Sequence, residues 1–252
     1  MTKHAFSLWN NLLGWFAFLV AFITYYLTAE PTASFWDAGE YIATSAKLQV
    51  GHPPGAPFYQ IFGAFFSMFA SDDSQIAFMV NLMSGVASAF AILFMFWSIT
   101  LLLKKLTKNI EGNSKTSDAA ILVSSTIGAL TFTFTDSFWF SAVEAEVYAM
   151  AACLMAAMFY IGLLWERDMH QPRGNRWLIL ICLIIGLSFG VHFMGLLTIP
   201  AIGFLYYFKT YKTITVKNFI VANLVVVRIL LFIYKLLLPY PLTFFAKMEV
   251  FF

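Results

Sequence analysis

A polar loop in this otherwise apolar chain carries two carboxylates, Asp37 and Glu40, three residues apart. Trp36 and Tyr41 flank them, and a Gly-His-Pro-Pro-Gly turn follows at residues 51–55. Only 11% of the residues are charged, so a loop that gathers acids, aromatic rings and a rigid turn differs sharply from the rest of the chain. We interpret this loop as a candidate active site.

The spacing of Asp37 and Glu40 predicts a shared helix face. If Ser34 caps a short helix that runs to Lys47, side chains at i and i+3 point in nearly one direction, and both acids can address one substrate. One of them could then act as a general base, which requires a carboxylate within ~2.6–3.2 Å of the proton that it removes. The alternative, in which both acids only solvate an exposed loop, stays open from the spacing alone.

The turn at residues 51–55 is predicted to be stiff. Its prolines have a restricted φ and its glycines permit unusual backbone angles, so His52 would be held close to the membrane surface. From there His52 could hydrogen-bond a phosphate or a sugar. A single histidine without a set of partner ligands is weak evidence for a metal, so we predict no metal site. An incidental histidine in a structural turn is the alternative.

A second acidic group combines Asp136, Glu144 and Glu146 with the aromatic run at residues 138–140 and with Tyr148. Aromatic rings can pack against the C–H faces of a sugar while carboxylates bind its hydroxyls, so this group could bind a sugar. Trp and Tyr are also expected as an interfacial belt in a membrane protein, and acids can stabilise the start of a following helix. Both interpretations stand.

Arg228 and Lys235 lie inside the last long apolar segment, about two helical turns apart and therefore on one predicted face. A cation near the centre of a membrane span costs at least ~2.5 kcal/mol, so it normally faces a bundle interior or a wet cavity. Either residue could neutralise a lipid-linked phosphate, although Lys235 is close enough to the helix end to reach the interface. His192, between two shorter apolar segments, is interpreted as an interfacial histidine.

The composition indicates a membrane protein. Of the 252 residues, 61% are hydrophobic, and the mean hydropathy is +0.79, far from the usual balance of soluble domains. The net charge of +2 is too small to indicate nucleic-acid binding. Cys153 and Cys182 both lie in apolar segments, so we expect no disulfide framework.

We therefore predict an all-α, polytopic membrane helical bundle of about seven transmembrane helices, because several segments reach the ~20 apolar residues that cross a bilayer. The predicted spans are 10–29, 76–103, 119–140, 146–165, 177–191, 194–208 and 218–239. The loop at residues 30–75 is expected to contain short interfacial helices, one of them within the apolar piece 57–70. Residues 1–252 would form a single transmembrane domain.

The distribution of basic residues predicts the orientation. With a cytoplasmic N-terminus, nearly all loop Lys and Arg residues lie on the inner side, and only Lys47 and Lys247 lie outside. Because cytoplasmic loops are enriched in Lys and Arg, this orientation is favoured. It puts the loop that contains Asp37 on the outer side.

Three stretches resemble a known family: residues 35–41, residues 51–55 and Glu144-Ala-Glu146-Val-Tyr148. With an acidic first outer loop, a His-Pro-Pro turn and an apolar interfacial helix, the chain resembles the GT-C class of membrane glycosyltransferases. Within that class it is similar to the bacterial protein O-mannosyltransferase-like group. The resemblance covers essentially the whole chain, which corresponds to the N-terminal part of such enzymes, so we expect the chain to lack their C-terminal part.

The resemblance implies an inverting enzyme that moves a sugar, a mannose-like hexose, from a polyprenyl-phosphate donor to Ser or Thr hydroxyls of exported proteins. It implies that an acid of the first outer loop, here Asp37, is the base, and that Glu40 assists by holding acceptor or donor. The partners would be the lipid-linked donor, the protein acceptor and the lipids of a bacterial inner membrane, with no nucleic acid and no certain cofactor. Classical members have adjacent acids, whereas two residues separate Asp37 from Glu40, so the choice of base stays open.

A transporter or flippase for a lipid-linked or anionic solute is the alternative function, with Arg228 and Lys235 as substrate cations. That function predicts charges or broken helices near the membrane midplane in both halves of the chain. The acids gather in the outer loops instead. A non-catalytic scaffold would leave the rigid loop at residues 37–57 unexplained.

Overall fold

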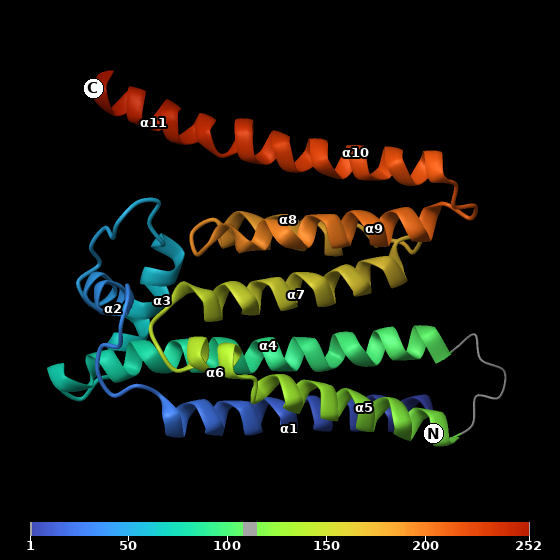
Figure 1. Ribbon diagram of the computed structural model, residues 1–252, viewed down its shortest axis with the longest axis horizontal. Helices are drawn as coiled ribbons and strands as arrows, with labels where there is room; N and C mark the ends of the chain where they lie inside the picture. Colours follow the sequence, from blue (N-terminus) through green and yellow to red (C-terminus); the bar gives the residue numbers. More distant parts are fainter. Residues whose placement is uncertain (1, 108–114, 252) are drawn as a thin grey trace. The chain divides into compact units, whose positions relative to one another are not determined.

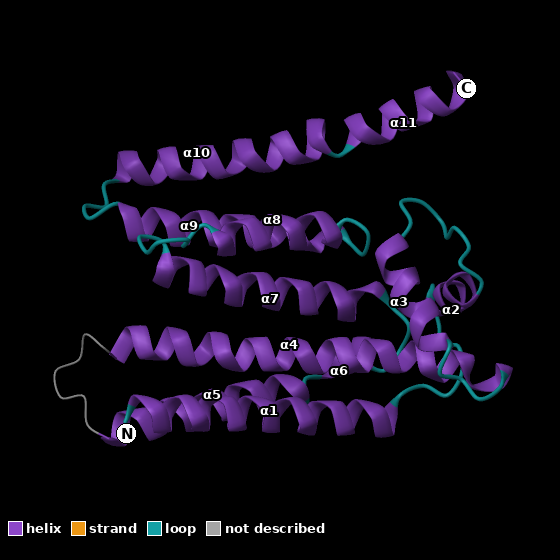
Figure 2. Cartoon of the chain, turned by 180° about the vertical axis from the view of Figure 1, so that it is seen from behind, coloured by secondary structure: helices purple, strands orange, loops and turns teal. Residues whose placement is uncertain are grey.

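The computed structural model describes residues 2–107 and 115–251, and all regular structure in these residues is helical (Figure 2). The α-helices are α1 (Lys3–Thr28), α2 (Ala38–Ala46), α3 (Pro57–Ser67), α4 (Ile76–Thr107), α5 (Lys115–Thr133), α6 (Asp136–Ala142), α7 (Val147–Asp168), α8 (Arg176–Ser188), α9 (Thr198–Thr210), α10 (Val216–Phe232) and α11 (Pro239–Phe251). Two 3₁₀ segments, η1 (Asp73–Gln75) and η2 (Phe193–Leu197), and a π-helical segment, η3 (Ile233–Leu237), complete the set. The predicted all-α class is confirmed for the described residues.

The chain divides into two compact units, residues 1–195 and 196–252. In the first unit α4 is the central helix and packs against α1, α5 and α7. These four helices lie lengthwise beside one another, and α2 and α3 gather at the end opposite to the N-terminus (Figure 1). In the second unit α9 packs on α10, where the rings of Phe204 and Phe219 stack with centroids 5.7 Å apart.

Small side chains allow the helices of the first unit to approach closely. Ala17 and Ala21 of α1 and Ala89 of α4 are fully buried in one apolar cluster. Interfaces between membrane helices are enriched in such residues. Their small side chains let the two helix backbones come close and gain van der Waals contact. The resulting bundle is a rigid base for the polar segments at its end.

Five helical stretches of the described residues are long and apolar enough to cross a membrane, or six if α5 and α6 form one bent span. They indicate a multi-pass membrane protein. Two predicted spans differ from the structure. Residues 119–140 are not one helix, because the chain becomes extended at Thr135 and α6 departs from α5 at 67°. Residues 177–191 form only α8, whose 13 residues reach ~20 Å, short of the ~30 Å hydrocarbon core.

The single-domain expectation and the orientation stay predictions. The basic residues used for the orientation include Lys108, which lies outside the described residues. At one end of the first unit, Lys105 and the buried Glu166 form an ion pair of 2.9 Å. At the other end lies the polar loop between α1 and α4.

Asn81 on α4 attaches that loop to the bundle. Its side chain is fully buried, and its Nδ2 donates to the carbonyl oxygens of Glu30 at 2.7 Å and Thr32 at 2.9 Å. The backbone N–H of Glu30 also donates to the carbonyl of Val143, at 2.9 Å. A buried amide that serves two carbonyls outside any helix holds an otherwise exposed segment in one place.

We expect Asn81→Ala to release the segment that follows α1, because both carbonyls lose their donor, at a cost of about 1–3 kcal/mol. Thermal unfolding in detergent should shift to lower temperature, and limited proteolysis should cut within residues 29–36 more quickly. Ser88→Ala is the matched control, since Ser88 is buried on the same helix and its hydroxyl has no hydrogen-bond partner among the described residues. Equal protease sensitivity in the two variants would contradict this anchoring role.

Candidate active site

Asp37 lies immediately before the first residue of α2, at the point where the anchored loop becomes helical. The expected cap, Ser34, does not fill this position: that prediction is wrong, because the Ser34 hydroxyl instead donates to Oε2 of Glu144 at 2.7 Å. The preceding residue, Trp36, has a positive φ of 62° and a side chain that is 87% exposed. Few residues other than glycine adopt this conformation, so the chain is strained just where Asp37 is presented.

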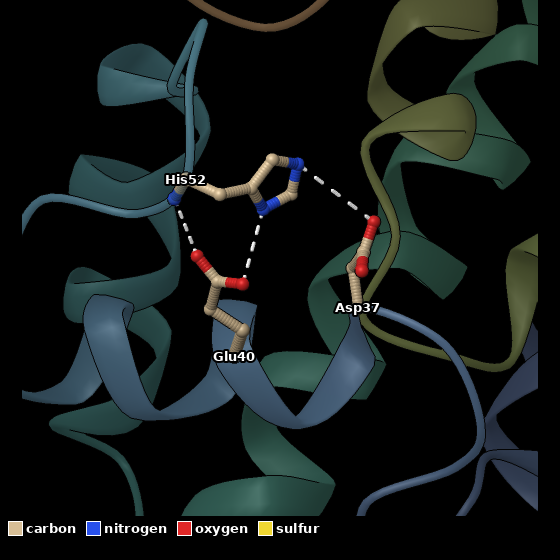
Figure 3. A group of neighbouring side chains, drawn as sticks. All are labelled: Asp37, Glu40 and His52. Carbon is tan, nitrogen blue, oxygen red and sulfur yellow. Dashed lines mark hydrogen bonds and ion pairs between the residues drawn. The ribbon is translucent and has the colours of Figure 1, made fainter.

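The Glu40 carboxylate is occupied by His52. Its Oε1 accepts the backbone N–H of His52 at 2.5 Å, and its Oε2 lies 3.0 Å from His52 Nδ1 (Figure 3). Gly51 makes this approach possible, since a Cβ there would lie 2.9 Å from Oε1 of Glu40. The predicted stiff turn thus holds His52 against α2.

These contacts stabilise charge on both partners. The backbone N–H of His52, together with its ring, lowers the pKa of Glu40. The hydrogen bond to Glu40 and the charge of that carboxylate raise the pKa of His52. Glu40 therefore favours the imidazolium form of His52.

Asp37 faces the other ring nitrogen of His52. Its Oδ2 lies 3.9 Å from Nε2, beyond hydrogen-bond distance, and the two side chains are 56% and 45% exposed. Asp37, Glu40 and His52 each offer a possible metal-ligand atom, and these atoms lie within 4.8 Å of one another. Both Glu40 oxygens already bind His52, however, so the group is organised around the histidine.

A cavity of about 280 Å³ opens beside this group, within the first unit. It is lined by Asp37, Tyr41, His52, Pro54, Gly55, Glu146, Val147, Tyr148, Phe189, Val191, His192 and Phe193. The lining combines two carboxylates with several aromatic rings and two imidazoles. Such a wall suits a ligand with both hydroxyls and apolar faces.

Glu146 lies where α2 and α7 both begin. The backbone of Asp37 and the backbone of Val147 favour its ionised form and so act to lower its pKa. Burial, the charge of Asp37 and the charge of Glu144 together raise the pKa of Glu146 to about 7. Glu146 therefore holds a proton far more readily than an ordinary glutamate, next to a carboxylate that is exposed.

The opposite wall comes from the turn after α8. The carbonyl of Gly190 accepts the backbone N–H groups of Phe58 and Tyr59, at 2.8 and 3.2 Å. A side chain at Gly190 would meet the Cβ of Phe58 at 2.7 Å, so glycine is needed for this contact. The contact brings His192 to the cavity, where its ring lies 5.4 Å from that of Tyr148.

His192 and Tyr41 have defined roles in this wall. The backbone N–H of Met194 donates to Nδ1 of His192 at 3.1 Å, and burial lowers the pKa of His192, so the neutral ring carries its proton on Nε2. Tyr41 packs edge-on against the buried Tyr59 with ring centroids 5.2 Å apart, and burial with nearby acids raises its pKa to about 12. Both are neutral hydrogen-bonding groups near pH 7.

Some expected site residues do not line the cavity. Trp36 points to solvent, Asp136 is exposed at the start of α6, and Glu144 is buried against Ser34. Of the predicted set in the first unit, the cavity brings together Asp37, Tyr41, His52, Glu146 and Tyr148, with Glu40 bound to His52 behind them. The interpretation of His192 as merely interfacial missed its contact with the cavity. The neighbouring glycine in Gly-Val-His was the available signal, since it marks a close backbone approach.

Arg228 and Lys235 belong to the second unit, where both are exposed. The π-helical segment Ile233–Leu237 begins between them and contains Lys235. Because a π-helical turn changes the angular step along a helix, seven residues no longer guarantee one face. Their shared face stays a prediction.

Comparison with known proteins gives a family. The family described as "Protein O-mannosyl-transferase TMEM260 N-terminal domain" matches residues 37–215. The chain is also 25% identical over 151 residues to "Protein O-mannosyl-transferase tmem260" of Dictyostelium discoideum. That match covers 60% of this chain but 16% of the relative's length. No solved structure matches.

The family match covers more than half of the chain and includes every residue that lines the cavity. The chain therefore belongs to the protein O-mannosyl-transferase TMEM260 N-terminal domain family.

Proposed function

We propose that this chain is the membrane part of an inverting GT-C glycosyltransferase. It moves a mannose-like hexose from a polyprenyl-phosphate donor to Ser or Thr hydroxyls of exported proteins. The observation that carries this proposal is a cavity lined by the Asp37 carboxylate in a chain of the protein O-mannosyl-transferase family.

Asp37 is the proposed base. Both oxygens of Glu40 already accept hydrogen bonds from His52, so taking up a substrate proton there would weaken these contacts. Asp37 has a carboxylate that lines the cavity and is more than half exposed. The raised pKa of Glu146 supports this assignment, since a neutral carboxyl next to Asp37 avoids two adjacent negative charges.

The same cavity would bind the sugar. The rings of Tyr148 and Phe193 offer faces for packing against C–H groups, while Tyr41 and His192 offer hydrogen bonds. Among the described residues that line it there is no Lys or Arg. We propose that Arg228 and Lys235 of the second unit bind the donor phosphate, as charge-assisted contacts to phosphate are strong.

We propose that the N-terminus is cytoplasmic and that the cavity opens on the outer side. At one end of the first unit, the loop at residues 30–56 is joined by hydrogen bonds to residues 143 and 144, and Gly190 accepts hydrogen bonds from the start of α3. The pair of Lys105 and Glu166 is at the other. Together with the Lys and Arg residues of the predicted inner loops, this arrangement supports a cytoplasmic N-terminus.

Asp37→Asn should lower sugar transfer at least about 100-fold, because general-base catalysis contributes at least that factor. The variant is introduced into the gene, and glycopeptides of exported proteins are quantified by mass spectrometry, with membrane insertion checked in parallel. Asp73→Asn serves as the control, since Asp73 is an exposed acid of the same outer loop that does not line the cavity. Normal glycosylation in the Asp37 variant would rule out this base.

Glu146 should give the folded state a pH dependence. Its pKa is about 7 when folded and 4.5 as a free side chain, so the folded state binds the proton more tightly. Its contribution to stability is therefore full below about pH 4.5 and is lost as the pH rises to 7. Thermal unfolding midpoints measured in detergent from pH 5 to pH 8 should fall more steeply for the wild type than for Glu146→Gln. Parallel curves would show that Glu146 does not titrate in this range.

If these cations bind the donor phosphate, Arg228→Ala or Lys235→Ala should raise the donor KM about tenfold, because each variant loses one charge-assisted contact. The rate at saturating donor should change less. Lys217→Ala, a lysine near the start of the same helix, is the control. An unchanged donor KM in both variants would show that neither cation binds the donor phosphate.

A further inference from the structure

We propose that Asp37 and His52 act as one proton-handling pair, in which His52 passes on the proton that Asp37 accepts, and that Glu40 is the positioning residue that orients His52. This inference rests on the proposed sugar transfer, which it extends from one base to a route for the proton. It also assigns Glu40 a role away from the substrate.

The contacts of Glu40 define how the imidazole is held. The carboxylate binds both the backbone N–H and the Nδ1 of His52, at 2.5 and 3.0 Å. A carboxylate accepts and does not donate, so it requires the proton of the ring to be on Nδ1. The neutral ring then has its lone pair on Nε2, directed toward Asp37 (Figure 3).

The distance between Asp37 and Nε2 leaves room for one oxygen atom. The two groups are 3.9 Å apart, and Nε2 has no hydrogen-bond partner among the described residues. An oxygen placed at a normal hydrogen-bond distance of about 2.8 Å from each would fit between them. A water molecule can bridge the two groups, because it has one hydrogen for Oδ2 and one for Nε2, whereas a substrate hydroxyl can donate to only one of these acceptors.

The reaction balances without a further reactant. The acceptor oxygen forms a bond to the anomeric carbon of the sugar, and the bond from that carbon to the phosphate oxygen breaks. The phosphate leaves with the electron pair. The hydroxyl proton passes to Asp37, then through a water molecule that bridges Oδ2 and Nε2 to the ring of His52, and from the resulting imidazolium to water at the exposed ring.

The charges around His52 favour the step to the imidazole. Glu40, Asp37 and Glu146 all raise its pKa, and the neutral Tyr41 ring lies beside it, with centroids 6.2 Å apart. His192 is the contrast within the same cavity, because it is more buried and its Nδ1 accepts a backbone N–H in place of facing an acid. Of these two imidazoles, His52 is the one built to take up a proton.

The first test measures the histidine directly. The chain contains four histidines, so ¹³C-labelled imidazole signals can be assigned in detergent by replacing each in turn. In Glu40→Gln the titration midpoint of His52 should fall, because its anionic partner is gone, while that of His192 stays. An unchanged His52 midpoint would overturn the positioning role of Glu40.

The second test follows the pH profile of sugar transfer with the whole protein. His52 must be neutral to accept a proton, so kcat/KM should rise with pH through the His52 midpoint, and this limb should move to lower pH in Glu40→Gln. Glu40→Asp should restore part of the wild-type profile. His52→Gln should lose about tenfold or more in rate, and added imidazole should rescue His52→Ala. His170→Gln, at an exposed histidine outside the cavity, is the control.

The outcomes separate the two proposals. Wild-type rate and pH profile in His52→Gln would overturn the proton route while leaving the proposed function intact. If the wild type transferred no sugar but the His52 midpoint still responded to Glu40→Gln, the proposed function would fail and the orientation of His52 by Glu40 would be supported.

Discussion

A hydrocarbon environment tolerates almost no unpaired polar groups, and this constraint decides where the protein can do chemistry. Backbone groups in a span must be satisfied within a helix, so long apolar helices form the bulk of the first unit. In the described part of the first unit, the charged side chains lie in loops or near the ends of the long helices. At one such end, hydrogen bonds join the loop after α1 to the loop after α6, and the turn after α8 to the start of α3.

At that end, three carboxylates of similar intrinsic acidity acquire different properties from their surroundings. Glu40 is bound to His52, and its pKa is lowered. Glu146 is buried between two helix starts beside another acid, and its pKa is raised to about 7. Asp37 is left exposed on the cavity wall. Environments that give neighbouring carboxyl groups different proton affinities are typical of sites where one group acts as an acid and another as a base.

Much of the architecture could be predicted because apolar length and composition report directly on membrane spans. The helical class followed from these signals, as did the short helix within residues 57–70, which corresponds to α3. The failures have local causes. The bend at Thr135 and the early end of α8 depend on turns of a few residues, which a hydropathy average over a long window does not detect. Ser34 does not cap α2 because it binds Glu144, a residue 110 positions away that local sequence does not indicate.

The amino-acid sequence by itself determined that the loop around Asp37 is the polar exception in an apolar chain, and that its Gly-His-Pro-Pro-Gly turn is stiff. Only the tertiary structure decided how the two acids differ. Their spacing in the sequence does not distinguish Asp37 from Glu40, because residues at positions i and i+3 lie on the same face of a helix. The turn carries His52 back onto Glu40, while Glu146 lies beside Asp37 and the Gly190 turn forms the opposite wall of the cavity. These contacts join residues distant in the chain, and the packing of separate helices creates them.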